Sequence, residues 1–256
     1  MAAVRTCPSE VKDDEWALVA PYRCPMREDA PRRDYALRDL FNALRYLART
    51  GCPWRCLPHG LPHGLPPWAP VYQQWPRWRD ARAVEAIVHD LNVLRRPLLE
   101  RPLLERPAAP SAAVPDGRTR QSPPGSGHRA GRDGAKRRKG GKARIAALAP
   151  GQWLGVGIAP ANEQERAQAG EPCRQVREIT GRTVAAGFVD QGDTGEETAY
   201  AAAVHGVARQ AVTKPAGETG FVRLPRRWLV ERGFARLRRF RRLGRDYDRL
   251  SISLRQ

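Results

Sequence analysis

Three acidic residues stand at positions where they could act together. Asp190 ends the apolar run TVAAGFVD (residues 183–190) and precedes the turn signal QGDTG, and Asp116 ends the run SAAVPD (residues 111–116). Glu231 lies near the C-terminus in an arginine-rich segment with helical spacing. Clustered carboxylates bind hard divalent cations, and a pair of such cations can activate the attacking oxygen and stabilise the leaving oxygen of a phosphodiester. If the three acids converge, they predict a metal site.

Each acid also has a purely structural interpretation. Asp190 could cap the helix that follows its turn, because acidic side chains bind the free amides of a helix N-terminus. Glu231 could form a local ion pair with Arg227, four residues earlier on the same helix face. Spacing alone does not decide between these interpretations, since a long segment contains several acids by chance.

The charge of the chain favours a nucleic-acid partner. Lys and Arg number 45 against 27 Asp and Glu, a formal net charge of +18 at pH 7. Such an excess repels itself in a compact fold, whereas binding to a polyanion releases counterions. The stretch HRAGRDGAKRRKGGKARIA (residues 128–146) predicts a basic loop that follows a DNA backbone, with a disordered basic tail as the alternative. Its candidate DNA-binding residues are Arg129, Arg132, Lys136, Arg137, Arg138, Lys139, Lys142 and Arg144.

The sequence shows no clear signal for secretion, a membrane span, disulfides or a zinc site. No apolar run has the length of a secretory signal or a membrane span, so we expect the protein in the cytoplasm. Five scattered cysteines do not form a disulfide pattern. Cys52 and Cys56 precede His59 and His63 at spacings that zinc tolerates, but the second histidine is a tandem copy in LPHGLPHGL. We therefore do not favour a zinc site.

The first hundred residues predict helices only. Residues 34–51 and about 80–95 carry apolar side chains at helical spacing, and a shorter helix is expected near Asp13. Pro76, inside VYQQWPRWRD, is expected to end or kink a helix. Tryptophans interleaved with arginines favour a helical core, although stacking on nucleic acid is the open alternative. These tryptophans are Trp54, Trp68, Trp75 and Trp78.

The rest of the chain predicts a linker and a mixed α/β domain. Residues 96–110 are rich in Pro and Arg and contain a duplicated RPLLE unit. Short apolar runs then predict strands, three in succession followed by alternating helix and strand, which is typical of a mixed sheet with flanking helices. We expect a helical domain at 1–95, a linker at 96–110 and an α/β domain at 111–256. The expected strands are 111–116, 143–148, 153–160, 183–190 and 206–212, with helices at about 163–177, 196–205 and from Pro225 onward.

Several motifs in order resemble one family. The stretches HRAGRDGAKRRKGGKARIA, APANEQERA, FVDQGDTGEE and LPRRWLVERGFARLRRFRRLGRDYDRL resemble the transposases of bacterial insertion sequences of family five, in the Asp-Asp-Glu class. The N-terminal stretch FNALRYLARTGCPWRCLPHGLPHGLPPWAPVYQQW, with one extra LPHG, looks like the helical domain of the same family. The resemblance covers about residues 10–95 and 108–250.

The resemblance implies a fold, a site and a reaction. The α/β domain would be ribonuclease H-like, with Asp116, Asp190 and Glu231 as catalytic residues and ligands of Mg²⁺ or Mn²⁺. Arg227 and Arg238 would hold DNA phosphates on the same helix face as Glu231. The partner would be double-stranded DNA, both transposon ends and target, and a homodimer on DNA stays open. The reaction would be phosphodiester hydrolysis at the transposon end, followed by strand transfer.

Several features depart from the family pattern, including the run ARIAALAPG and a segment between Gln168 and Thr180 that is shorter than usual. Pro115 precedes Asp116 where the family has a β-branched residue, and proline removes a donor from a central strand. The chain stops at SISLRQ, where the family continues into an apolar helix, and it carries two tandem duplications. These features are expected of a degenerate or truncated copy. A working transposase, a catalytically impaired DNA-binding remnant and a metal-dependent nuclease of the same fold are the open alternatives.

Overall fold

The chain folds into two compact units in the computed structural model. The described residues are 8–22, 34–60, 64–91, 94, 112–124, 126, 130–148, 152–163, 170–190, 196–212 and 228–245. The N-terminal unit comprises Met1–Val88 and Arg238–Gly244, and the sheet unit comprises His89–Leu237 and Arg245–Gln256. The predicted boundaries near 95 and 110 fall outside the described residues and stay predictions.

The N-terminal unit is helical, as predicted. Its elements are α1 (Asp13–Val19), the 3₁₀ turns η1 (Ala20–Tyr22) and η2 (Trp54–Cys56), α2 (Leu37–Thr50), α3 (Trp68–Asp80) and α9 (Arg241–Gly244). Residues 83–91 are also helical. The apolar stripe of α2 supplies Leu40 and Leu47, which pack with Val71 and Trp78 of α3 in one buried cluster. The two longest helices, α2 and α3, therefore form because each has one apolar face to bury.

Pro76 does not end its helix. α3 continues through Pro76 to Asp80. Its buried residues lie on both sides of the proline, with Val71 and Gln74 before it and Trp78 after it. Packing of this continuous buried face outweighs the backbone hydrogen bond that proline cannot donate. Of the two expected outcomes at Pro76, an end of the helix was wrong, and a kink stays a prediction.

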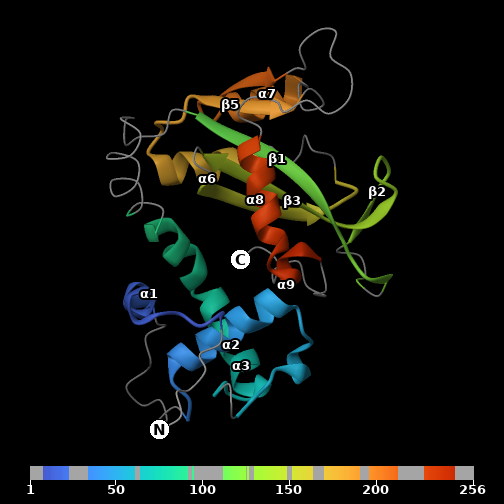
Figure 1. The fold of residues 1–256 in the computed structure, drawn as a ribbon. Coiled ribbons are helices and arrows are strands. Elements are labelled where there is room, and N and C mark those ends of the chain that lie inside the picture. Colours follow the sequence, from blue (N-terminus) through green and yellow to red (C-terminus); the bar gives the residue numbers. More distant parts are fainter. Residues whose placement is uncertain are drawn as a thin grey trace. The chain divides into compact units, whose positions relative to one another are not determined.

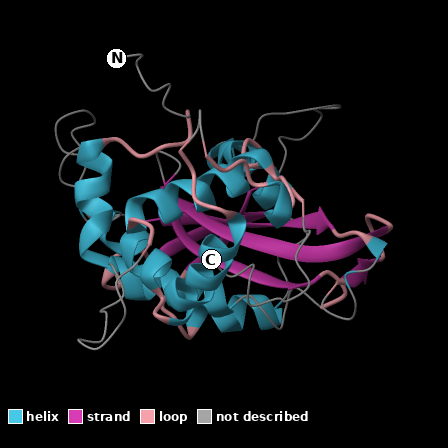
Figure 2. Ribbon diagram, turned by 90° about the horizontal axis from the view of Figure 1, so that it is seen from below, coloured by secondary structure: helices cyan, strands magenta, loops and turns pink. Residues whose placement is uncertain are grey.

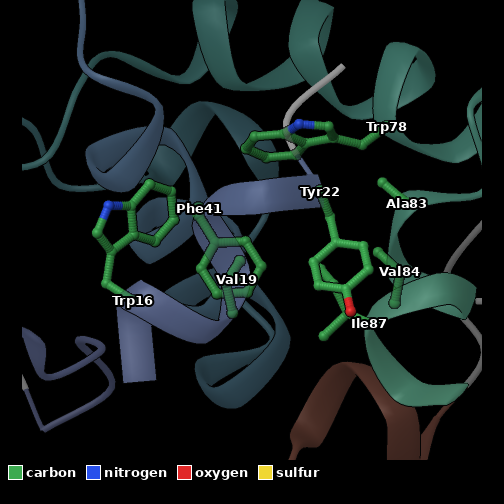
Figure 3. A pocket seen from close by; sticks show the side chains of 8 residues that line it. All are labelled: Trp16, Val19, Tyr22, Phe41, Trp78, Ala83, Val84 and Ile87. Atoms are coloured by element: carbon green, nitrogen blue, oxygen red, sulfur yellow. The ribbon is translucent and has the colours of Figure 1, made fainter. Parts of the chain in front are cut away.

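The tryptophans divide between the core and its margin. Trp78 is buried, whereas Trp54 and Trp68 are half-buried and pack against the core cluster from outside. Figure 3 shows an apolar pocket between Trp78, Trp16 and Phe41, which is also lined by side chains of η1 and of residues 83–87. The core interpretation is thus confirmed for Trp78, while the half-buried rings keep an outward surface.

The sheet unit is built on one mixed sheet. Its strands are β1 (Ala112–Gln121), β2 (Gly131–Asp133), β3 (Arg138–Leu148), β4 (Gln152–Pro160), β5 (Ala186–Asp190) and β6 (Ala208–Val212). The order is β2-β3-β1-β5-β6, with β4 also paired to β3, and Figure 2 shows the strands side by side in magenta. β1, β3 and β4 are antiparallel, whereas β5 and β6 run parallel to β1. The predicted mixed sheet is confirmed, and β1 and β3 are longer than predicted.

Helices cover both faces of this sheet. α8 (Trp228–Arg238) crosses one face (Figure 1), where Val230 and Phe234 pack with Val114 of β1 and Phe188 of β5. α6 (Gly170–Thr180) packs on the opposite face through Val176. α7 (Glu196–Ala203) connects β5 to β6. The first residue of α6 lies later than the predicted 163, and residues 164–169 are outside the described part of the chain.

Candidate active site

Asp116 lies on the central strand, on the face that α8 covers. Its neighbours two residues away on β1 both reach α8: Val114 shares a buried cluster with Val230, and the Arg118 guanidinium lies 5.1 Å from the ring centre of Phe234. Alternate residues of a strand share a face, so Asp116 lies on the same face. Its carboxylate accepts a hydrogen bond from the Gly117 amide at 2.8 Å.

The register of β1 with β5, if it continued, would bring Asp190 level with Asp116. β1 pairs with β5 through Ala112 with Ala186 and Ala113 with Gly187. Continuing this offset along both strands brings position 190 opposite position 116. Asp190 is also the last residue of β5, where it pairs with Val212 of β6. The carboxyl ends of parallel strands are where open sheets present their chemistry.

Pro115 marks the place where the pairing of β1 with β5 ends. The last pair of these two strands, Ala113 with Gly187, comes two residues before the proline. On the other side β1 continues through Pro115, which pairs with Ala146 of β3. Because proline has no amide hydrogen, it cannot extend a ladder that needs its donor. Within the described residues, the pairing of β1 with β5 therefore stops short of the level of the two aspartates.

Glu231 is exposed in the first turn of α8. Its neighbours Leu229 and Val230 are buried against the sheet. Among the residues that the structure describes, none forms an ion pair with Glu231. The proposed local partner, Arg227, lies outside them. The structure thus brings Asp116 and the helix of Glu231 to one face of the sheet, and both interpretations of Glu231 stay open.

The carboxylates suit a hard cation in their chemistry. Oxygen ligands from aspartate and glutamate are what Mg²⁺ and Mn²⁺ prefer. Within the described residues no three His, Cys, Asp or Glu side chains gather closely enough to hold a metal ion. The side chain of Asp190 is outside this set, so the three-acid site stays a prediction. Cys52 and Cys56 are free thiols, and His63 is also outside the described part.

The predicted basic loop is a β-hairpin. β2 and β3 pair from Gly131 with Gly140 to Asp133 with Arg138, and residues 134–137 form the turn. The buried Asp133 holds this turn, because its carboxylate accepts hydrogen bonds from the Thr119 hydroxyl and from the Lys136 amide, the latter at 3.0 Å. We call residues 131–142 the basic hairpin. A fixed hairpin presents its cations without the ordering cost of a disordered tail.

The predicted DNA-binding residues separate into three groups. Lys142 is half-buried, and Arg144 is buried at 8% exposure on β3, opposite Gly117. A buried guanidinium does not reach a DNA backbone, so we leave Arg144 out of the proposed set. Arg129 and Arg227 lie outside the described residues. The exposed members are Arg132, Lys136, Arg137, Arg138 and Lys139 on the basic hairpin and Arg238 at the end of α8.

Two residues of this region escaped the sequence interpretation. Arg118 lies two positions after Asp116, and the period of two in a strand could have placed it on the same face. Asp133 gave no signal of its own, because an acid among lysines and arginines is expected to be a solvated partner. Its burial depends on Thr119, fourteen residues earlier.

Asp133 makes the hairpin sensitive to acid. The Thr119 hydrogen bond, then the amide and charge of Lys136, hold the pKa of Asp133 below its ordinary value of 3.8, although burial opposes them. The stability that it contributes is therefore present above pH 3.8 and is lost as the pH falls through the lower folded-state pKa.

We expect Asp133→Asn to lower the free energy of unfolding by about 1 to 3 kcal/mol at neutral pH, and less below pH 3.8. Urea unfolding at both pH values measures this, and Glu163→Gln is the exposed control. An equal loss at both values would contradict the assignment.

The arrangement defines a class of protein before the family is considered. The sheet combines an antiparallel meander of β1, β3 and β4 with the parallel strands β5 and β6, which is typical of ribonuclease H-like domains. Comparison with known families agrees, since residues 110–253 match the transposase DDE domain model and residues 11–88 match the DUF4096 model of the IS4/5 family. The chain belongs to the IS4/5 family of DDE transposases. It matches no curated protein and no solved structure.

The described helices do not meet what a membrane span requires. None of them is both long enough and apolar enough to cross a bilayer.

Proposed function

We propose that this protein is a DNA transposase that cuts phosphodiester bonds at the ends of an insertion sequence and transfers the freed strand to target DNA. The observation that carries the proposal is the register of β1 with β5, whose continuation would bring Asp116 and Asp190 to the same level under α8, the helix that bears Glu231. Family membership supports DNA as the partner and a divalent metal as the cofactor. Its place of action would be the cytoplasm, where bacterial DNA is accessible.

The chain's own residues divide the work of this reaction. Asp116, Asp190 and Glu231 would hold Mg²⁺ or Mn²⁺, which when bound supplies Lewis-acid stabilisation of the developing charge on the phosphate oxygens. The Gly117 amide fixes the orientation of the Asp116 carboxylate through its hydrogen bond. Arg118, held over Phe234 on the same face, would bind the phosphate next to the cut bond. Neither step needs a covalent enzyme intermediate.

The basic hairpin would hold the DNA backbone beside this site. Its exposed cations, with Arg238 on α8, supply a charge-driven contact that does not depend on sequence. Arg227 and Arg129 stay in the proposed set from the sequence alone. A homodimer on DNA remains part of the proposal, because an insertion sequence has two ends and each must be joined to target DNA.

The salt dependence of binding tests the basic hairpin. Six to ten neutralised phosphates should weaken duplex binding by about three to five decades between 50 and 200 mM salt. Replacing Lys136, Arg137, Arg138 and Lys139 with glutamine should reduce the slope of log K against log salt by about 0.9 for each phosphate that is no longer neutralised. Fluorescence anisotropy with labelled duplex measures the slope.

A matched control removes the same number of charges elsewhere. Glutamine at Lys12, Arg174, Arg177 and Arg182 changes the net charge equally but leaves the basic hairpin intact. An equal fall in slope in both variants would show that net charge, and not the hairpin, binds DNA.

The impaired remnant is favoured by one observation. Pairing of β1 with β5 stops before Pro115, so the described ladder between these strands does not extend to the level of the two aspartates. A site whose supporting strands separate holds its ligands less firmly. DNA binding without Mg²⁺-dependent cleavage of insertion-sequence ends would be the result expected of a remnant. Cleavage of any DNA, without strand transfer, would instead indicate a nuclease of the same fold.

A further inference from the structure

An alternating row of arginines and aromatic rings lies at the margin of the N-terminal unit. The Arg55 guanidinium lies 5.6 Å from the ring centre of Trp68, and that of Arg242 lies 5.3 Å from Trp54. Tyr72 joins the two halves, because its ring meets Trp54 edge to face at 5.1 Å and Trp68 at 6.1 Å. We call these residues, Arg55, Trp68, Tyr72, Trp54 and Arg242, the arginine–aromatic row.

The row is anchored on one side and open at its centre. Trp54 and Trp68 pack against the buried helical cluster. Arg242 is fixed by a hydrogen bond from its guanidinium to the Cys52 carbonyl at 2.9 Å. Tyr72 of α3, in contrast, is 52% exposed, although a large aromatic side chain is usually buried. The two tryptophan rings are therefore held in place by the core, and the middle ring, that of Tyr72, is the most exposed of the three.

The surroundings of the row are positively charged. Residues 41–79 contain arginines at 45, 49, 55, 77 and 79 and no Asp or Glu. The segment that supplies Arg242 to the same unit, Arg238–Gly244, adds further arginines and no acid. An acidic peptide or a nucleic acid is electrostatically complementary to such a surface, and a cation is not.

We propose that the arginine–aromatic row binds DNA that carries unpaired bases, with Arg55 and Arg242 on phosphates and the Tyr72 ring stacked on a base. Guanidiniums held over indole rings keep their N–H edges in a fixed plane, which suits phosphate oxygens. An exposed ring flanked by such groups is how proteins bind single strands without sequence preference. Bases inside a duplex are already stacked, so Tyr72 discriminates in favour of unpaired ones. The inference rests on the proposed function for its DNA partner.

The test compares two DNA probes in buffer with EDTA and no divalent metal. One probe is a blunt duplex, and the other is the same duplex with a short unpaired tail of mixed sequence. We expect the full chain to bind the tailed probe more tightly. Tyr72→Ala should reduce affinity for the tailed probe by about 5- to 140-fold, the loss of one stacked base, and should leave the blunt probe nearly unchanged.

Two variants separate stacking from structure. Tyr72→Phe keeps the ring and should keep the preference for the tail. Tyr200→Ala removes a tyrosine that is 74% exposed on α7 and should change nothing. An unchanged ratio between the two probes in Tyr72→Ala, or equal binding of both probes by the unaltered chain, would overturn the proposal.

A measurement on the unaltered chain guards against a misfolded variant. A fluorescent base analogue in the tail loses fluorescence when it stacks on an aromatic ring. Quenching on binding is expected, and binding without quenching overturns the stacking role. Because no cleavage is measured, failure of the stacking tests leaves the proposed transposase activity standing. If the unaltered chain does not bind the blunt duplex, that result counts against the transposase activity instead.

Discussion

Glu231→Gln, made in a Pro115→Ile background, should abolish Mg²⁺-dependent cleavage of insertion-sequence ends. Isoleucine restores a backbone donor at position 115, so that β1 can pair with β5 up to the level of the acids. Removing one carboxylate from a set that acts as a unit should then lower the cleavage rate by roughly three orders of magnitude or more. Because Glu231 is exposed, the free energy of unfolding should hardly change. Single-turnover cleavage of labelled ends measures the rate.

Further variants decide between the interpretations of Glu231. Asp190→Asn should cause the same loss, and the double variant should be little worse, since residues of one unit are not additive. Glu196→Gln is the matched control, because Glu196 is an exposed acid in the first turn of α7. Cleavage that survives Glu231→Gln would remove Glu231 from the site. No cleavage in any background, with DNA binding retained, would favour the remnant.

Gly140→Ala should be among the most destabilising single substitutions in the sheet unit. A Cβ atom at position 140 would lie 1.8 Å from the Arg120 carbonyl oxygen and 2.8 Å from its carbon, both of which are backbone atoms. Gly140 also pairs with Gln121 on one side and Gly131 on the other. Any side chain there must separate β1 from β3, so we expect a loss of about 3 kcal/mol or more.

Thermal unfolding gives the simplest measurement of this effect. The midpoint of the sheet unit should fall by about 6 to 12 °C, as expected for a loss of that size in a domain of this length. Gly134→Ala, in the turn of the same hairpin, is the control, because nothing lies within 4 Å of its Cβ position. Equal midpoints for the two variants would show that β1 and β3 are not as close in solution.

Most of the sheet could be predicted because its central strands are apolar. Residues 112–116, 143–148 and 186–190 gave clear signals, since both faces of these strands are buried under helices. The extensions of β1 and β3 gave none, because GRTRQ and RKGGK contain no apolar residue larger than glycine. Their pairing is set by Asp133 and by the close approach at Gly140, and such tertiary contacts leave no periodicity.

The candidate site was only half accessible to sequence interpretation. The resemblance pointed to the acids, but the register whose continuation would bring Asp116 and Asp190 to one level follows from the pairing of Ala112 and Ala113 with β5, which no local pattern encodes. Arg144 shows the opposite failure. Its charge and its basic neighbours predicted a surface residue, yet its place on the central β3 strand buries it.

The membership of α9 in the N-terminal unit has a consequence for the order of events during protein synthesis. The Arg242 guanidinium lies over the Trp54 ring and donates a hydrogen bond to the Cys52 carbonyl. These contacts complete a unit whose other elements are made first. Gly51, with a φ of 72°, lies so close to α9 that a Cβ atom added to it would be 2.9 Å from the Cβ atom of Arg241. Residues 1–88 are therefore synthesised before the α9 segment that completes their unit, because residues 89–237 of the sheet unit come between them. A nascent chain stalled before residue 241 would expose Trp54 on the outside of an unfinished helical unit.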